Sequence, residues 1–434
     1  MARHKIPGGA RNRIGGIFGS LALVLSVAAC SSPNVPSGRS ATSSSRQTTK
    51  ASTTIPPQVS TTSSPASTSE MLTAVAFSNP KQGYGLYTRQ GPVKCEDLVG
   101  ATSDGGATFH HLVSATSWSC GENASARSLA FDDHGDGFLY GPDLFISHDD
   151  GAEWSASQQP GAVLAVQALG DSVWMVEAEC PQTTGPQEPC PLRLLESNNG
   201  GRTWATSPVP ANATLNNGLA SESALGQTWL VRISKSSAYL GTNPAGNQYG
   251  SEDNAPLWFT SDGGRSWSNR QLPCAMDASS AVVSAAPDGA LLAVCASQPG
   301  AGSQLKSTLR STDGGSTWTV QSTCVIPSSG VPVPSCTMEP PTGGYLGGID
   351  ALSADTLFLV GDRSSLLVSH NGGVTWQPVQ PLMGDSSDGT NQVIFFNNSD
   401  GLVLGYNGYN NDVATLWSTR DGGTKWNAVV PRVA

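Results

Sequence analysis

Charged residues are scarce in this chain of 434 residues, because Asp, Glu, Lys and Arg make up only 13% of it, against about 25% in an average globular protein. Acidic residues outnumber basic ones by 33 to 23, which gives a formal net charge of −10. The sequence also lacks a basic patch interleaved with aromatic residues. We therefore expect no nucleic-acid partner, because such binding depends on clustered Lys and Arg side chains.

Helical periodicity is missing as well. After residue 70 no long stretch carries apolar residues at helical spacing, whereas Gly (49) and Pro (29) are frequent. This pattern favours a turn-rich β protein. Nucleophile motifs such as G-x-S-x-G and phosphate loops such as G-x-x-x-x-G-K-[ST] are absent. The sequence therefore predicts no catalytic residue and no cofactor.

The N-terminus has the organisation of a targeting signal. Residues 1–29 begin with the basic segment "MARHKIPGGARNRIGG" and continue with the apolar segment "IFGSLALVLSVAA", which is too short to span a bilayer stably. The closing "VAAC" resembles the lipobox of bacterial lipoproteins. This resemblance implies cleavage before Cys30 and acylation of that residue, which would anchor the protein to the outside of the bacterial cell membrane. An ordinary secretory signal followed by an incidental cysteine is the alternative.

Residues 30–70 are mostly Ser, Thr and Pro with few apolar residues. Such a segment cannot bury enough surface to fold, so we expect a flexible tether between the anchor and a folded domain at 71–434. Beyond Cys30 eight cysteines remain. An even number suits an oxidising compartment, but eight cysteines allow 105 pairings.

One octapeptide recurs seven times in the folded domain. The copies are "TSDGGATF" (102–109), "SHDDGAEW" (147–154), "SNNGGRTW" (197–204), "TSDGGRSW" (260–267), "STDGGSTW" (311–318), "SHNGGVTW" (369–376) and "TRDGGTKW" (419–426). Their final aromatic residues are spaced by 45, 50, 63, 51, 58 and 50 residues. This repeat resembles the Asp-box, or BNR repeat, of sialidases, Vps10/sortilin domains and photosystem II assembly factors of the Ycf48 kind.

The residue types in the octapeptide predict a structural turn. Glycine occupies the fifth position in every copy and can adopt positive φ. The third position supplies a backbone-capping oxygen from Asp104, Asp149, Asn199, Asp262, Asp313, Asn371 and Asp421. A catalytic or metal-binding role that needs charge would not tolerate Asn199 and Asn371. We therefore interpret these seven residues as structural.

Two expected strands precede most copies, joined by a tight turn, as in "SLAFDDHGDGFLYG" (128–141) and "SALGQTWLVRI" (223–233). A third strand leads into the octapeptide and a fourth leaves it. The expected fold is all-β, a single seven-bladed β-propeller of four-stranded antiparallel blades. Each unit looks complete, so closure of the ring is expected to need no strand from the opposite terminus.

This topology places the short turns and octapeptides on one face, the box face, and the longer connections on the opposite loop face. Binding is expected at the loop face, because variable loops on rigid scaffolds carry function. The longer connections are residues 179–191, 239–256, 296–306, 320–345 and 405–413. All eight cysteines fall on the same face, in connections or at strand ends. The predicted disulfides join sequence neighbours: Cys95–Cys120, Cys180–Cys190, Cys274–Cys295 and Cys324–Cys336.

Two other chemistries compete with a binding role. A sialidase-like glycoside hydrolase would need three arginines around a pocket, and among Arg89, Arg127, Arg193, Arg232, Arg270, Arg310, Arg363 and Arg432 only Arg232 is a candidate for the centre. The segment "FDDHGDG" holds Asp132, Asp133, His134 and Asp136, but its position predicts a turn rather than a metal site, with adventitious Ca²⁺ as the alternative. We expect a membrane-anchored binding protein with an unknown protein or glycan ligand.

Overall fold

The computed structural model describes residues 69–434 except 121–126, 181–189, 216–224, 227, 245–253, 275–277, 301, 326–334, 338–340, 380–388 and 408–412. The predicted signal peptide, Cys30 and nearly all of the predicted tether lie outside these described residues. Within them every regular element is a strand, and no helix is long and apolar enough to cross a membrane.

The strands form seven antiparallel sheets, here called blades 1 to 7 in chain order. Blades 1 and 2 contain β1 (Ser69–Phe77), β2 (Gly83–Gln90), β3 (Lys94–Thr102), β4 (Thr108–Ser119), β5 (Ser128–Phe131), β6 (Gly137–Tyr140), β7 (Leu144–Ser147) and β8 (Ser155–Ser157). Blades 3 and 4 contain β9 (Ala162–Leu169), β10 (Ser172–Ala178), β11 (Cys190–Ser197), β12 (Ala205–Ser207), β13 (Thr214–Leu215), β14 (Thr228–Arg232), β15 (Ala238–Thr242), β16 (Leu257–Thr260) and β17 (Ser268–Asn269). Blades 5 to 7 contain β18 (Ala278–Ala285), β19 (Leu291–Ser297), β20 (Lys306–Ser311), β21 (Thr319–Val325), β22 (Ser335–Thr337), β23 (Tyr345–Ala351), β24 (Leu357–Asp362), β25 (Ser364–Ser369), β26 (Gln377–Pro378), β27 (Gly389–Phe395), β28 (Gly401–Asn407), β29 (Val413–Thr419) and β30 (Asn427–Val429).

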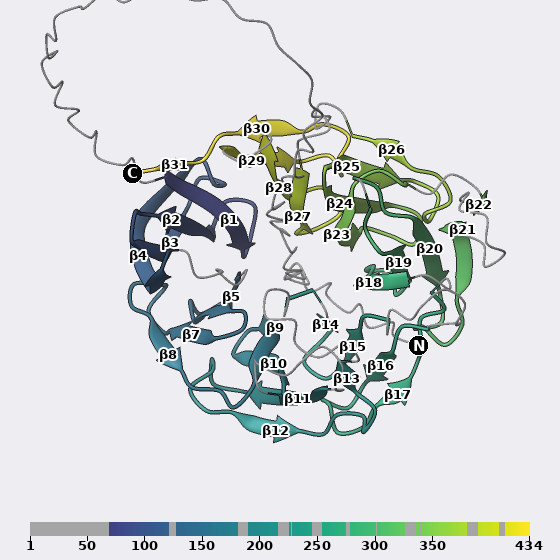
Figure 1. Ribbon diagram of the computed structural model, residues 1–434, viewed down its shortest axis with the longest axis horizontal. Helices are drawn as coiled ribbons and strands as arrows, with labels where there is room; N and C mark the ends of the chain where they lie inside the picture. Colours follow the sequence, from purple (N-terminus) through teal and green to yellow (C-terminus); the bar gives the residue numbers. More distant parts are fainter. Residues whose placement is uncertain are drawn as a thin grey trace, which may run out of the picture. The chain divides into compact units, whose positions relative to one another are not determined.

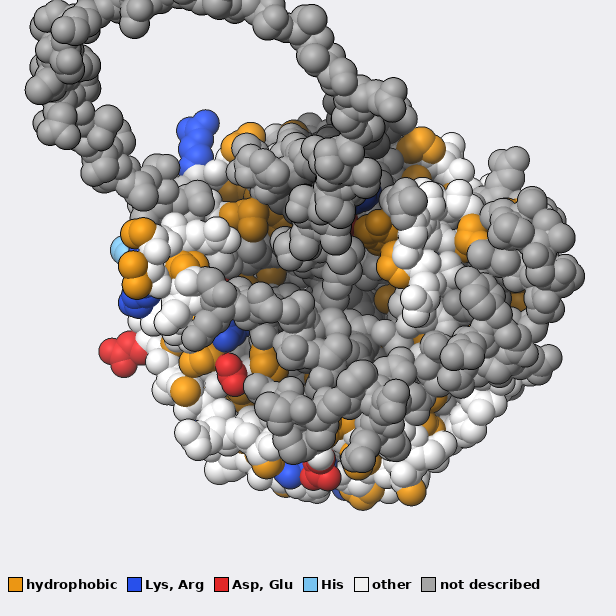
Figure 2. Space-filling view, viewed as in Figure 1, with side chains coloured by type: hydrophobic (Ala, Val, Ile, Leu, Met, Phe, Trp, Pro, Cys, Tyr) orange, Lys and Arg blue, Asp and Glu red, His pale blue; other side chains and the backbone are white. Residues whose placement is uncertain are grey.

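The seven blades form a ring, which confirms the predicted seven-bladed β-propeller (Figure 1). The first strand of each blade faces the centre, and the fourth lies at the rim. First strands of neighbouring blades contact one another around the whole ring, including β27 and β1. Figure 2 shows a surface with few charged side chains among its described atoms, as expected from the composition.

The hydrophobic core is divided into seven layers. The buried side chains of the described residues form seven clusters, and each lies between two neighbouring blades. The cluster that joins blade 7 to blade 1 contains Leu404 and Leu416 from blade 7 with Val75 and Phe109 from blade 1. Burial of apolar surface therefore closes the ring as well as holding consecutive blades together.

Polar side chains also connect the inner strands. Gln392 in β27 accepts a hydrogen bond from the Val75 backbone N–H in β1 at 2.8 Å. Gln167 in β9 accepts from Arg232 N at 2.9 Å, and Asp350 in β23 accepts from Phe395 N at 2.7 Å. These bonds satisfy backbone donors on inner strands that have no strand partner on that side.

The ring closure differs from the sequence-based prediction. Each blade takes its four strands from one continuous segment, but a further C-terminal strand, β31 (Arg432–Val433), pairs in parallel with β4 of blade 1. Arg432 N donates to Ala107 O at 3.1 Å, and Ala434 N donates to Phe109 O at 3.0 Å. The C-terminus therefore adds a fifth, outermost strand to the first blade.

In blade 4 the strand positions differ from the prediction. The segment 223–233 was expected to contain two strands, whereas Thr228–Arg232 is the single inner strand β14. The second strand is β15, which pairs with β14 along its whole length. Residues 239–242 of the predicted loop 239–256 therefore belong to a strand, and residues 245–253 lie outside the described residues.

Candidate functional site

The octapeptide forms the same hydrogen-bonded turn in all seven copies. In the last copy the Thr419 hydroxyl donates to Asp421 Oδ1 at 2.9 Å and accepts from Gly423 N at 2.9 Å. The same Asp421 oxygen accepts from Lys425 N at 2.8 Å. Equivalent bonds hold the other six turns. The first-position hydroxyl is thus as central to the turn as the third-position oxygen.

The two asparagine copies keep this bonding pattern. Asn199 Oδ1 accepts from Thr203 N at 3.0 Å, and its Nδ2 donates to Thr203 Oγ1 at 2.9 Å. In an aspartate copy the direction of the second bond is reversed, since Thr317 Oγ1 donates to Asp313 Oδ2 at 2.7 Å. This bond is the main cause that lowers the pKa of Asp313 to about 2. The turn thus needs a polar acceptor at this position, not a charge.

In most copies the fifth-position glycine brings the turn against the preceding blade. A Cβ built on Gly201 would lie 2.6 Å from Phe138 Cε1 of blade 2, and one on Gly423 would clash with the Phe358 ring of blade 6. The aromatic residue that ends each copy joins the core layer at the same boundary, as Phe109 and Trp426 do. Each octapeptide therefore fastens its own blade to the one before it.

The octapeptide also contacts the turn between the first two strands of its own blade. Gly105 N donates to Lys81 O at 2.9 Å in blade 1, and Gly422 N donates to Ser399 O at 2.9 Å in blade 7. Equivalent bonds occur in blades 2, 3, 4 and 6. The two sets of turns thus share one face of the ring, as the strand topology predicted.

Disulfides join the four predicted pairs, Cys95–Cys120, Cys180–Cys190, Cys274–Cys295 and Cys324–Cys336. Two positions differ in detail from the prediction. Cys95 lies within β3 rather than in a loop. Cys324 and Cys336 pair across β21 and β22, so the connection expected to be irregular contains a fifth strand in blade 5.

The loop face is only partly described. Parts of all five predicted binding loops lie outside the described residues: 181–189, 245–253, 301, 326–334, 338–340 and 408–412. The segment 296–306 is packed at its ends, where Gln304 and Lys306 are buried, whereas residues 298–300 and 303 are exposed. Lys306, 2% exposed, donates from Nζ to the carbonyls of Gln304, Gly343 and Gly344 at 3.0, 3.1 and 3.0 Å. Burial lowers the pKa of Lys306 to about 8.

Arg232 does not reach a central pocket. It is 9% exposed, and its guanidinium donates to Ser172 O at 2.7 Å and to Ser172 Oγ at 2.9 Å. The group also lies 4.5 Å from the centre of the Trp174 ring. Burial lowers the pKa of Arg232 to about 10. Arg232 therefore bridges blades 3 and 4 and is not available to clamp a substrate carboxylate.

The segment "FDDHGDG" forms the turn between β5 and β6. Asp132 Oδ1 accepts from the backbone N–H groups of His134 and Asp136 at 2.8 and 2.9 Å. Asp136 instead points toward blade 3, where Arg202 binds both of its oxygens at 2.8 and 3.1 Å. No group of three or more His, Cys, Asp or Glu side chains is positioned to hold a metal ion among the described residues.

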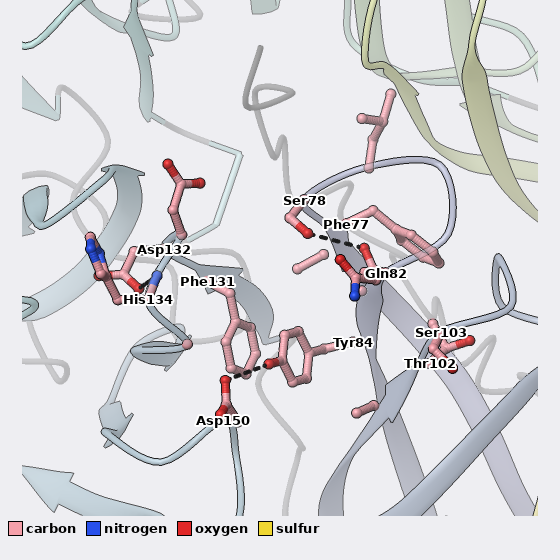
Figure 3. Close-up of a pocket in the computed structure, with 16 residues that line it drawn as sticks. Phe77, Ser78, Gln82, Tyr84, Thr102, Ser103, Phe131, Asp132, His134 and Asp150 are labelled. Atoms are coloured by element: carbon pink, nitrogen blue, oxygen red, sulfur yellow. Dashed lines mark hydrogen bonds between the residues drawn. The ribbon is translucent and has the colours of Figure 1, made fainter. Parts of the chain in front are cut away.

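A groove of about 390 Å³ opens on the box face between blades 1 and 2 (Figure 3). Tyr84 of β2 and Phe131 of β5 form one wall, where their rings stack with centroids 3.5 Å apart. Asp132, Asp133 and Asp150 also line the groove, and none of its lining residues is Lys or Arg. It is therefore an acidic groove with an aromatic wall.

Asp150 and Tyr84 were not singled out by the sequence analysis. Asp150 occupies the fourth octapeptide position at φ +59°, where the other six copies have glycine at φ between +66° and +78°. Its Oδ1 accepts a hydrogen bond from Tyr84 OH across the blade boundary at 3.2 Å. Burial, followed by the charge of Asp150, raises the pKa of Tyr84, so the phenol remains a neutral donor. The sequence held one indication of this site: "SHDDGAEW" is the one copy of the octapeptide without glycine at the fourth position.

Comparison with known proteins gives similarity at the level of fold. No family model and no curated protein matches the chain. A structure of YCF48 bound to D1 peptide is 18% identical, with coverage of 69% of this chain and 79% of that chain and a TM-score of 0.43. An ulvan lyase of a polysaccharide lyase family is 11% identical, with coverage of 82% and 91% and a TM-score of 0.47. An α-L-arabinanase from Penicillium chrysogenum complexed with arabinobiose is 13% identical, with coverage of 82% and 93% and a TM-score of 0.39.

Proposed function

We propose that this chain is a membrane-anchored extracytoplasmic binding or scaffold protein that takes a protein or glycan ligand on its propeller. In this proposal acylated Cys30 holds the chain at the membrane, the segment to residue 70 is a tether, and the loop face opposite the octapeptides receives the ligand. Assembly of an envelope complex is a role that such a scaffold would suit.

The observation that carries the proposal is how the arginines are used. Arg89 pairs with Glu70 and Glu96, and Arg127 pairs with Asp97 at 2.8 Å. Others contact carboxylates, carbonyls or rings of the fold: Arg193, Arg232, Arg270, Arg310 and Arg363. Side chains held in such separate contacts do not converge on one anionic substrate, which favours binding over the sialidase-like alternative.

The four disulfides support the proposed compartment. Disulfides persist in oxidising environments outside the cytoplasm. Each closes a short segment, with sequence separations of 25, 10, 21 and 12 residues, near the end of the strands from which the long connections leave. Such closures restrict the loop face, and ordered loops lose less entropy on binding.

Replacement of the predicted lipidation site tests the anchor. Cys30→Ala should remove acylation, because both the thiol and the new N-terminal amine belong to this cysteine. We expect the variant to leave the detergent phase in a phase-partition assay, while the wild type remains in it. Unchanged partitioning would refute the lipid anchor.

Chemical crosslinking in the native membrane tests the binding role. We expect the full-length protein to be linked reproducibly to the same neighbouring protein or glycan in independent preparations. The purified protein should show no turnover of fluorogenic sialosides or arabinosides. Turnover above that of a heat-treated sample would instead support the glycoside hydrolase.

A further inference from the structure

The repeated architecture provides an internal comparison for the acidic groove. Tyr84 is the second residue of β2, and Tyr239 is the second residue of β15. Both tyrosines lie near the fourth octapeptide position of the following blade. Tyr84 OH binds Asp150, whereas a Cβ built on Gly314 would lie 3.4 Å from Tyr239 OH. The boundary between blades 4 and 5 thus resembles the groove but lacks its carboxylate.

The turn itself does not require the side chain of Asp150. Six other copies form the same turn with glycine at this position, and φ of +59° is a conformation that L residues rarely adopt. In the turn Asp150 uses its backbone N–H, which donates to Gly135 O at 3.2 Å as the fourth-position N–H does in other blades. A non-glycine residue kept in this conformation is a reason to look for a function of its carboxylate.

The aspartates of the groove are not paired with Lys or Arg among the described residues, although His134 lies near Asp132. Asp136, in the same turn, is paired with Arg202 and His148. In the part of the chain that the structure describes, no ion pair involves Asp132, Asp133 or Asp150. Asp132 is 5% exposed and lines the groove, and its Oδ2 has no hydrogen-bond partner. A buried carboxylate oxygen without a donor is costly, so a cationic donor in the groove would be favoured.

We propose that the groove between blades 1 and 2 binds a lysine or arginine side chain of a partner protein, with its cationic group beside Asp132 and Asp150. This inference rests on the binding role proposed above and adds a site on the box face. The stacked rings of Tyr84 and Phe131 offer an apolar wall for the methylene stem of such a side chain. A metal ion fits less well, because three carboxylate or imidazole ligands do not converge among the described residues.

Peptide titration of the full-length protein tests the groove. The probe is an acetylated, amidated pentapeptide, Gly-Ser-Arg-Ser-Gly, and its neutral control carries citrulline in place of arginine. We expect saturable binding of the arginine peptide only. Asp150→Gly should weaken this binding at least tenfold, while its unfolding midpoint stays the same or rises because glycine suits the backbone conformation.

A second variant separates a site from general charge attraction. The double variant Asp150→Gly/Gly314→Asp has the wild-type net charge, but its carboxylate lies beside Tyr239 between blades 4 and 5. We expect its peptide affinity to remain as low as that of Asp150→Gly. Restored affinity, equal binding of the citrulline peptide, or binding of Ca²⁺ that Asp150→Gly abolishes would overturn the proposal.

The same variant distinguishes this inference from the broader function. Equal capture of a native partner by the wild type and by Asp150→Gly would overturn the groove and leave the binding role intact. Glycoside turnover by the wild type would overturn the binding role. The peptide titration would then still show whether the groove binds a basic side chain.

Discussion

At the scale of single residues, the fifth-position glycine meets two requirements. In Gly423 φ is +87°, and a Cβ would enter the space of the Phe358 ring in the preceding blade. Gly263, at the fourth position of its copy, meets only the first requirement, since it has φ of +75° and open space where a Cβ would lie. Gly423 and Gly263 therefore separate backbone strain from crowding between blades.

Alanine substitution at these two glycines should give different losses of stability. We expect Gly423→Ala to lower the free energy of unfolding by about 3 kcal/mol, because strain and overpacking add. Gly263→Ala should lower it by about 1 kcal/mol, from backbone strain alone. Urea denaturation measures both. Equal losses would mean that the glycine does not determine the contact between blades.

Glu177 in β10 is the most exceptional carboxylate among the described residues of the core. It is fully buried, neither of its oxygens has a hydrogen-bond partner, and burial raises its pKa from 4.5 to about 7. Between those two values the folded state binds a proton that the unfolded state has released. Stability contributed by this group should therefore fall as the pH rises through this window and level off above pH 7.

Glu177→Gln should remove most of this pH dependence. A neutral amide is not ionised at high pH, so we expect the variant to gain about 1–3 kcal/mol over the wild type at pH 8. The difference should shrink toward pH 5, where the folded wild-type carboxyl is protonated. Thermal unfolding across this range gives the comparison. A difference that does not vary with pH would contradict the assigned shift.

Residue types in the octapeptide predicted its turn, but not the partners across blades. The capping oxygen and the positive φ are local properties, readable from "DGG" alone. The contacts of Gly423 with Phe358 and of Asp150 with Tyr84 join residues that are far apart in the sequence. Only the stacking of blades brings these side chains together, so the sequence singled out Asp132 and Asp133 but not the groove that they form with Tyr84 and Asp150.

At the scale of elements, the C-terminal segment that contains β31 links the end of the chain to blade 1 through two backbone hydrogen bonds. Arg432 N donates to Ala107 O, just before β4, and Ala434 N donates to Phe109 O in β4. The segment is short and its side chains are exposed. The segment therefore lacks the alternation of apolar and polar residues that predicts a strand. For this reason the sequence indicated no terminal strand in the closure of the ring. The strand contributes mainly by satisfying backbone groups at the edge of blade 1.

Removal of residues 432–434 should loosen blade 1 without unfolding the propeller. Each lost hydrogen bond contributes about 1 kcal/mol, so we expect a decrease of about 2 kcal/mol in the free energy of unfolding. Residues 107 and 109 contribute carbonyl acceptors to these bonds, so we expect faster amide hydrogen exchange from a loosened blade edge, in β4 and β30. Unchanged exchange there would show that β31 does not hold the ring closed.

Blade 4 shows a limit of reading elements from local patterns. The residues before β14 include one apolar position and a glycine, and they resemble the end of a strand and its turn. The true second strand, Ala238–Thr242, contains a glycine and a threonine and looks like a loop. Its strand state depends on pairing with β14 and β16, which is not a local property.

At the scale of the whole molecule, seven similar core layers join the seven blades into a ring. Composition, turn chemistry and the spacing of the octapeptides were sufficient to predict the class, the blade number and the four cysteine pairs. The ligand was not predictable, because the groove that we propose as a binding site differs from the repeat and is not formed by it. The common residues therefore provide stability, and Asp150 and its neighbours form the additional site that we propose for a basic side chain of a partner.

Photo-crosslinking from matched positions on the box face tests this central claim most directly. Ser103 and Ser261 are both exposed second-position residues of the octapeptide, and only Ser103 lines the acidic groove. A photoreactive phenylalanine analogue is placed at either position in the full-length protein in its native membrane. We predict that a defined partner protein is captured from position 103 and not from position 261. Equal capture from both positions, or from neither, would contradict the assignment of recognition to the groove.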